Sequence, residues 1–383
     1  MGPYLPNYLK GKNRRLVFDL LRERGQMSRA EITRDTGMSF PTAMKVVDAF
    51  LEKGLLVELD ETGPAAGAGR KGRLLRFEPG AYRAVGVECE GRFARVGLAD
   101  MAGGVQARET IELGDFARTR DLSPLAAAIR RMCAAANGAP VLGVCIGFPA
   151  NLDPDAAAIV SYAAMDIQQP TSFAQVFPAF WREVELPVYL ENDANLACEG
   201  EAFLRRGAGG AANMLYLSIG SGCGGAVRLD GKLRRGARCR AGEVGAMLLQ
   251  PALGAPGRSA ARETLEDAVC LAALERRFGA ALRDGAQPGE ASAQAMRDYL
   301  CGPLSGAVYS LVMTLDVELC VLAGIVPGAL GMQLCTQVSE ALRAALPEST
   351  PVRVEPSVSA DAGVIGAAAT VFERSLDALL GSG

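Results

Sequence analysis

Strands alternate with helices through most of this 383-residue chain, and this alternation limits the fold more than any other feature. A meander of three apolar strands over 85–111 is followed by a helix over 122–135 and a strand over 141–146. The theme starts again at 214 with strand, glycine-rich turn and strand, and it ends with a helix over 360–380. A repeated theme of this kind predicts an α/β protein whose two related lobes enclose a cleft.

The first 80 residues follow a different pattern, with three helices ahead of two strands. Helix-like segments over 13–24 and 39–53 flank a shorter one, which starts with the capping box formed by Ser28 and Glu31. Two strands joined by a glycine-rich, basic loop follow within 55–77. Helix, tight turn, helix and a two-stranded wing are typical of a winged helix-turn-helix domain. We therefore expect a DNA-binding domain here.

Charge supports this expectation, because the first 80 residues carry a balance of +4 and the rest of the chain carries −7. The alternative is a three-helix interaction module with a solvated basic loop. For DNA binding, Ser39, Phe40, Thr42, Ala43 and Lys45 are expected in the major groove, and Arg14, Arg15, Arg70, Lys71 and Arg73 at phosphates or in the minor groove.

The sequence Glu-Asn-Asp-Ala-Asn at 191–195 directly follows a short apolar strand over 187–190. A carboxylate beside two amides at the carboxyl end of a strand can hold and deprotonate a polyol hydroxyl, with Asp193 as the base. The same residues also fit a helix N-cap, in which Asn192 or Asp193 accepts from the first amides of a helix over 194–204. On this stretch alone, both interpretations stay open.

Composition excludes several kinds of chemistry. The chain has no histidine, which rules out imidazole catalysis and histidine-ligated metal. Its ten cysteines form no Cys-x-x-Cys pair and lie mostly within apolar runs, as reduced core thiols do. No apolar run reaches the ~18 residues that a membrane span needs, and the start of the chain lacks a signal-peptide pattern. We expect a cytoplasmic protein with no membrane partner.

Several motifs together resemble the ROK family, whose name joins repressors, unassigned reading frames and sugar kinases. The resemblance covers nearly the whole chain, and its first 80 residues look like the winged helix of the repressor members. The motifs are 191–195, similar to a sugar-binding and catalytic segment; Gly220-Ser-Gly-Cys-Gly-Gly225, similar to a phosphate loop; Ala241-Gly-Glu-Val-Gly245, similar to a sugar-contacting motif; and Thr264-Leu-Glu266, similar to a segment whose glutamate contacts sugar.

The resemblance implies an actin-like or hexokinase-like fold behind the winged helix. It implies a DNA-binding domain over 1–80, a first lobe over 81–192 that includes a C-terminal helix at 367–383, and a second lobe over 193–366. It also implies sugar contacts from Asn151, Asn192, Asp193, Glu243 and Glu266, and a phosphate-loop remnant at Gly220, Ser221, Gly222 and Gly224. The alternative for Glu243 and Glu266 is that they are solvated carboxylates.

Departures from the family pattern argue against catalysis. Ala246 stands where the family has a histidine, and 251–262 lacks the cysteines of the family's zinc loop, so we expect no metal and no cofactor. Glu90 stands where the first phosphate loop has a glycine. A carboxylate ~4 Å from a phosphate charge costs roughly 4 kcal/mol at an effective dielectric of 20, or about three powers of ten in affinity for ATP.

These observations leave three hypotheses. In the first, the chain is a transcriptional regulator, by analogy a repressor, that binds operator DNA as a homodimer or dimer of dimers and senses a sugar or sugar derivative in the cleft. In the second, it is an ATP-dependent sugar kinase with an accessory DNA-binding domain and Asp193 as the base. In the third, the two lobes are only a dimerisation scaffold.

Overall fold

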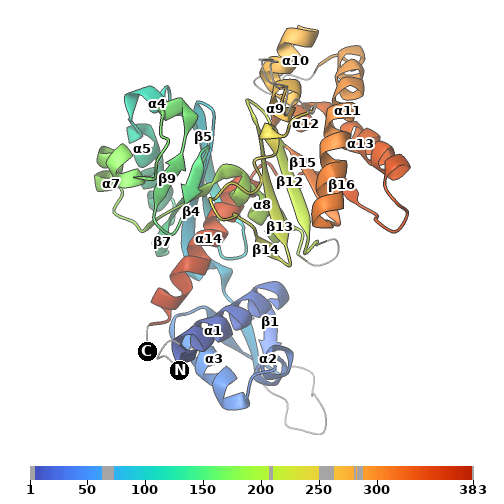
Figure 1. Ribbon diagram of the computed structural model, residues 1–383. Coiled ribbons are helices and arrows are strands. Elements are labelled where there is room, and N and C mark those ends of the chain that lie inside the picture. Colours follow the sequence, from blue (N-terminus) through green and yellow to red (C-terminus); the bar gives the residue numbers. More distant parts are fainter. Residues whose placement is uncertain are drawn as a thin grey trace.

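The computed structural model describes residues 5–62, 73–206, 210–249, 263–279, 282 and 288–381. Figure 1 shows a small, mostly helical N-terminal domain beneath two larger lobes. The last helix, over residues 362–379, ends beside this small domain. The α/β fold with a winged helix and two lobes, expected from the sequence, is confirmed.

The N-terminal domain forms as the capping residues predict. Ser28 and Glu31 make both bonds of the capping box, and Ser39 caps the third helix through Thr42. Phe18, Phe50 and Phe77 form edge-to-face ring contacts in its core. The elements are α1 (Leu5–Arg24), β1 (Gln26–Ser28), α2 (Arg29–Thr36), α3 (Phe40–Glu52), β2 (Leu56–Thr62) and β3 (Arg73–Phe77), with the sheet in the order β1-β3-β2.

The first lobe is built on a five-stranded sheet in the order β11-β7-β4-β5-β6. Its antiparallel meander is β4 (Arg83–Glu90), β5 (Phe93–Asp100) and β6 (Val105–Glu112), and its parallel part adds β7 (Val141–Phe148) and β11 (Val188–Asn192). The ends of β4, β7 and β11 therefore meet at one edge of the sheet, which is where α/β proteins bind ligands.

The second lobe repeats this plan with a sheet in the order β14-β13-β12-β15-β16. Its strands are β12 (Met214–Ile219), β13 (Cys223–Leu229), β14 (Lys232–Leu233), β15 (Leu319–Ala323) and β16 (Arg353–Pro356). The glycine-rich turn is shorter than the sequence predicts. Cys223 pairs with Ile219 and already belongs to β13, so only Gly220, Ser221 and Gly222 form the turn.

Further elements complete the two lobes, among them a small sheet in the order β10-β9-β8. Those of the first lobe are η1 (Pro79–Ala81), α4 (Phe116–Thr119), α5 (Ser123–Ala134), β8 (Asn151–Asp153), β9 (Ala158–Ser161), η2 (Ala163–Met165), β10 (Thr171–Ser172), α6 (Phe173–Val176) and α7 (Pro178–Glu183). Those of the second are η3 (Val244–Ala246), α9 (Leu265–Val269), α10 (Leu271–Phe278), α11 (Glu290–Leu315), α12 (Ile325–Leu330) and α13 (Met332–Ala345). Among the described residues, no helix is both long and apolar enough to cross a membrane.

Two helices, α8 (Asp193–Leu204) and α14 (Ala362–Leu379), cross at the centre of the molecule (Figure 1). Glycines allow their backbones to touch. A Cβ atom at Gly200 would lie 1.8 Å from the carbonyl oxygen of Ala362, and one at Gly366 would lie 1.9 Å from that of Leu196. Because backbone meets backbone, any movement of one helix must be shared by the other.

Candidate functional site

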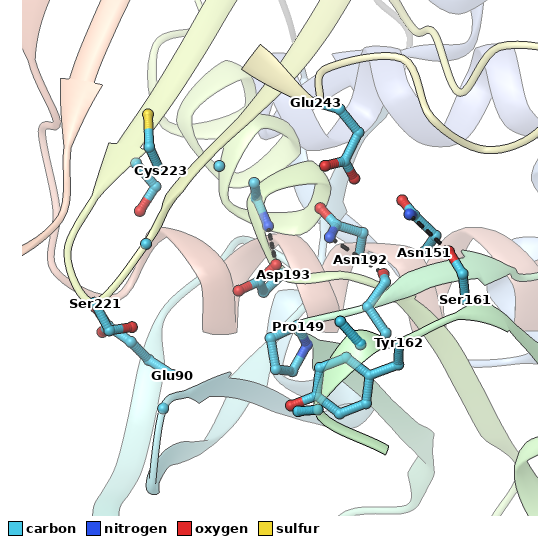
Figure 2. A pocket seen from close by; sticks show the side chains of 18 of the residues that line it. Glu90, Pro149, Asn151, Ser161, Tyr162, Asn192, Asp193, Ser221, Cys223 and Glu243 are labelled. Carbon is cyan, nitrogen blue, oxygen red and sulfur yellow. Dashed lines mark hydrogen bonds between the residues drawn. The ribbon is translucent and has the colours of Figure 1, made fainter. Parts of the chain in front are cut away.

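A cavity of about 800 Å³ lies between the lobes and is lined by residues of both. The first lobe contributes Glu88 and Glu90 at the end of β4, and the loop around Asn151. The second contributes the 220–222 turn and Glu243 (Figure 2). All five sugar contacts that the resemblance implies line this cavity: Asn151, Asn192, Asp193, Glu243 and Glu266.

The sequence left open whether Asn192 and Asp193 cap a helix or face a ligand, and in the structure each residue takes one of these roles. The side chain of Asn192 caps α8 by accepting from the backbone N–H of Asn195 at 3.1 Å. Asp193 accepts from the N–H of Ala194 at 2.9 Å and faces the cavity (Figure 2). Burial, together with the negative charges of Glu88 and Glu90, raises the pKa of Asp193 to about 7. Asp193 therefore titrates near neutral pH and can accept a proton from a ligand hydroxyl.

The wild type is expected to lose stability as the pH rises, and Asp193→Asn is expected to lose less. The folded-state pKa of about 7 exceeds the ordinary value of 3.8, so the proton favours folding below pH 4 and its contribution is lost as the pH rises to 7. Relative to wild type, Asp193→Asn should gain about 2 kcal/mol between pH 5 and pH 8. Urea unfolding at both values measures this, with the exposed Asp166→Asn as control. Parallel pH profiles for wild type and Asp193→Asn would contradict the assignment.

Asn151 and Glu243 meet across the cavity. In the amide orientation that satisfies both ends of Asn151, its nitrogen donates to Oε1 of Glu243 at 2.6 Å and to the carbonyl oxygen of Cys239 at 3.2 Å. Its oxygen then accepts from the hydroxyl of Ser161 at 3.0 Å. Burial raises the pKa of Glu243. The two residues thus link the lobes and present acceptors to the cavity, as recognition of hydroxyl groups requires.

Carboxylates flank both sides of the 220–222 turn. A Cβ atom at Gly220 would lie 2.9 Å from Oε1 of Glu90, and one at Gly222 would lie 2.9 Å from Oε2 of Glu266. Glu266 also accepts from the backbone N–H of Cys223 at 2.8 Å. A larger residue at either glycine would require the neighbouring carboxylate to shift. A turn that would offer its amides to phosphate is therefore lined by negative charge.

Arg95 on β5 partly balances the acidic end of β4. One of its nitrogens, Nη2, lies 3.0 Å from Glu88 and 3.4 Å from Glu90. One guanidinium thus forms ion pairs with two carboxylates. Burial nevertheless raises the pKa of Glu88. The position occupied by glycines in a phosphate loop holds a net negative cluster here.

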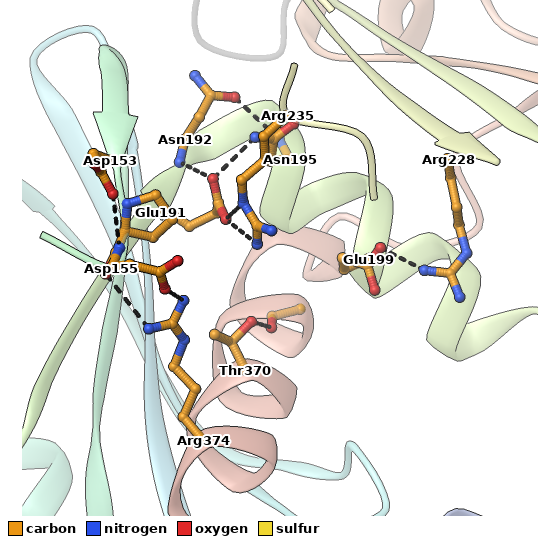
Figure 3. Close-up of polar contacts among 12 residues, drawn as sticks. Asp153, Asp155, Glu191, Asn192, Asn195, Glu199, Arg228, Arg235, Thr370 and Arg374 are labelled. Carbon is orange, nitrogen blue, oxygen red and sulfur yellow. Dashed lines mark hydrogen bonds and ion pairs between the residues drawn. The ribbon is translucent and has the colours of Figure 1, made fainter. Parts of the chain in front are cut away.

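An ion pair behind the cavity, between the buried Glu191 and the partly exposed Arg235, was not anticipated from the sequence (Figure 3). Glu191 is only 3% exposed and accepts from the amide of Asn195 at 2.9 Å and the backbone N–H of Asn192 at 3.0 Å. Its other oxygen lies 2.7 Å from Nε and 2.6 Å from Nη2 of Arg235. This pair joins the start of α8 to the segment that leads to Glu243. No local pattern reveals it, because the partners are 44 residues apart.

Glu191→Ala is expected to lower the free energy of unfolding by about 3 kcal/mol, because Asn195 and Arg235 would lose a buried partner. The matched control is Glu112→Ala, which removes an exposed pair with Arg92 and should cost less than about 0.5 kcal/mol. Urea unfolding measures both values. Equal costs for the two variants would show that the buried pair contributes no more than a surface one.

The winged helix presents only part of the surface that the sequence suggests. Ser39, Phe40 and Lys45 are exposed and Thr42 is partly exposed, whereas Ala43 is fully buried, so the expectation of DNA contact at Ala43 is wrong. Arg73 is exposed and pairs with Glu58 at 3.4 Å. Arg70 and Lys71 lie outside the described residues.

Arg14 is also misassigned as a DNA contact. Its side chain is buried and donates to the carbonyl oxygens of Leu380 at 3.0 Å and Gly381 at 2.8 Å. Arg15 forms an ion pair with Glu373 at 2.5 Å. Arg14 and Arg15 thus hold the end of α14, and Arg14 satisfies carbonyls at the end of that helix. Positive charge on α1 serves domain docking.

A model of the ROK family matches residues 84–374 of this chain. The chain belongs to the ROK family. Among relatives, this ROK protein is 27% identical over 241 residues to the xylose repressor of Caldicellulosiruptor bescii, covering 62% of this chain and 58% of the relative. It is 34% identical over 141 residues to the glucokinase of Halalkalibacterium halodurans, covering 35% of this chain and 40% of the relative. The chain thus spans less than two thirds of either relative.

Solved structures show the same fold. A ROK family transcriptional regulator, a homologue of the Escherichia coli MLC protein, matches 97% of this ROK chain and 98% of its own, with a TM-score of 0.75 and 17% identity. A ROK hexokinase from Thermus thermophilus matches 76% of this chain and 98% of its own, with a TM-score of 0.58 and 26% identity. At 97% coverage, the regulator's match includes most of the N-terminal region of this chain.

The segment 251–262 of this ROK protein, which lacks the cysteines of the family's zinc loop, lies outside the described residues. Ala246 ends η3, beside the cavity residue Glu243. Across the part of the chain that the structure describes, no group of three or more cysteine, aspartate or glutamate side chains is arranged to hold a metal ion.

Proposed function

We propose that this chain is a DNA-binding transcriptional regulator whose operator affinity is set by a sugar or sugar derivative in the cleft. The observation that carries the proposal is the path of α8 and α14. Helix α8 begins at the cavity with Asp193, and α14 begins against Glu88, whose carboxylate lies 2.4 Å from a Cβ position at Gly363. Helix α14 ends beside the winged helix (Figure 1), and Phe203 near the end of α8 contacts Arg22 of α1. The two functions are thus joined by rigid elements.

At the end of α8, Phe203 lies between two arginines. The guanidinium of Arg22 on α1 is 4.8 Å from its ring centroid, and that of Arg206 is 4.3 Å away. Burial, together with the positive charge of Arg206, lowers the pKa of Arg22 to about 10. The side chain of Arg22 is 3% exposed, and its Nε and Nη1 have no hydrogen-bond partner among the described residues.

The unpartnered N–H groups of this buried guanidinium oppose the docking, whereas its ion pair with Asp19 and the apolar contacts between α1 and α14 favour it. A small movement of α8 can therefore shift the balance between two positions of the winged helix. A ligand that binds one degree of cleft closure better than another supplies the necessary difference in free energy. In a dimer, such a shift would change the spacing of the two recognition helices, which must match half-sites about 34 Å apart.

The direct test is binding of the purified chain to DNA from upstream of its own gene at several salt concentrations. Affinity should fall linearly with salt on logarithmic axes, because counterions are released from phosphates. Lys45→Ala on α3 should weaken binding, whereas Lys232→Ala in the second lobe should not. Salt-independent binding, or equal affinities for both variants, would count against a DNA-binding role.

The kinase remains a second candidate, because Asp193 faces the cavity with a pKa of about 7, as a catalytic base would. The carboxylates around the 220–222 turn oppose it. An ADP-release assay over a panel of hexoses decides between the two. Sugar-dependent turnover that Asp193→Asn abolishes would establish the kinase. A flat thermal-shift profile over the same sugars would instead favour a scaffold.

A further inference from the structure

We propose that Phe40 reads the methyl group of a thymine in the major groove, so that each operator half-site carries a thymine at this contact. This inference rests on the proposed DNA-binding function and adds the kind of base that the domain recognises. It follows from which side of α3 is exposed, how that side is charged, and what stands at its tip.

The buried face of α3 leaves a defined outer stripe. Ala43, Val46, Val47 and Phe50 face the domain core. The opposite side of a 3.6-residue helix then carries Pro41, Lys45, Asp48 and Glu52, and all four are exposed. In Figure 1, α1 lies between α3 and the two lobes, which leaves this stripe accessible.

Charge along this stripe determines which end of α3 can approach DNA. Asp48 and Glu52 are exposed in its second half, where they would repel phosphates if the helix lay flat along the groove. The first turn contains no acidic residue, and the N-terminus of a helix carries partial positive charge. The helix is therefore expected to enter the groove with its N-terminal turn.

That turn is apolar at its tip. The hydroxyls of Ser39 and Thr42 hydrogen-bond to each other at 2.8 Å, and Ser39 also caps the helix. Phe40 is 56% exposed and stands beside the exposed Pro41. An exposed phenylalanine at a recognition tip gains by removing apolar surface from water. Thymine is the base that offers an apolar group in the major groove, its C5-methyl.

The test compares thymine with deoxyuridine, which differs from it only by this methyl group. Sites are first selected from a random duplex library with the full chain and then synthesised with deoxyuridine in place of thymine. One buried methyl is worth about fourfold in affinity, so a dimer that contacts one methyl per half-site should bind about 16-fold more weakly to the deoxyuridine duplex.

Variants assign the effect to Phe40. Phe40→Ala should bind both duplexes about equally, whereas Phe40→Leu should keep part of the preference for thymine. Phe93→Ala removes a phenylalanine of similar exposure, 49%, from the first lobe and should keep all of it.

The outcomes distinguish the thymine contact of Phe40 from the proposed DNA-binding function on which it rests. Equal wild-type affinity for the two duplexes, or a thymine preference that survives in Phe40→Ala, would overturn the role of Phe40 while leaving DNA binding established. If the wild type selects no duplex and shows no salt-dependent binding, the proposed function fails as well.

Discussion

Gly200→Ala is expected to lower the free energy of unfolding by about 3 kcal/mol or more. The added Cβ would lie 1.8 Å from the carbonyl oxygen of Ala362, so α8 and α14 must separate along their crossing. Backbone atoms cannot yield as flexible side chains do. Urea unfolding followed by circular dichroism measures the change.

The matched control is Gly306→Ala, which also replaces a glycine inside a helix. A Cβ at Gly306 on α11 meets nothing within 4 Å, so alanine should stabilise the chain by about 0.5–1 kcal/mol. Opposite signs for the two variants are the expected result. Similar values for both would mean that α8 and α14 are not in backbone contact, and the proposed path from the cleft to the winged helix would lose its basis.

Glu90→Gly is expected to raise the affinity for Mg-ATP by about thirtyfold. In isolation, a carboxylate beside a phosphate charge would cost roughly 4 kcal/mol. The structure reduces this figure because Arg95 lies 3.4 Å from Glu90 and the side chain is one third exposed. About 2 kcal/mol is then the appropriate estimate, which corresponds to thirtyfold. Titration calorimetry with Mg-ATP measures the change.

Two further variants separate charge from shape. Glu90→Gln keeps the length of the side chain and removes its charge, so it should recover most of the gain if repulsion is the cause. Glu185→Gln removes an exposed charge from the loop before β11 and should change nothing. Unaltered ATP affinity in Glu90→Gly would show that Glu90 does not obstruct nucleotide binding.

Local chemistry predicted much of the fold. Ser28 with Glu31, and Ser39, marked two helix starts because a capping side chain acts within three residues. Alternation of apolar runs predicted both sheets, since burial on a sheet imposes its period on the sequence. The strand β1 was missed because it is three residues long and exists only through pairing with β3. The turn after Ile219 was predicted too long because Cys223, Gly224 and Gly225 pair with β12 and belong to the strand despite the glycines.

The residues that line the cavity were predicted better than the long-range contacts that hold the surrounding elements in place. Asn192 and Asp193 were identified because a short motif contains both the cap and the carboxylate. The partner of Glu191 could not be found, because Arg235 reaches it only through the fold of the second lobe. Arg14 was misassigned for a related reason: a surface arginine and one that holds a distant helix end look alike in sequence. Long-range contacts of this kind are invisible to local patterns.

The most direct test of a ligand-gated regulator is the operator affinity of the full chain with and without a pool of pentoses, hexoses and amino sugars. If the cleft controls the winged helix, the pool should change the affinity by a factor of about 5 to 150, the usual range of coupling between two sites. Splitting the pool would then identify the effector. A chain that binds its operator and also binds a sugar, yet shows the same operator affinity with every sugar, would contradict the account.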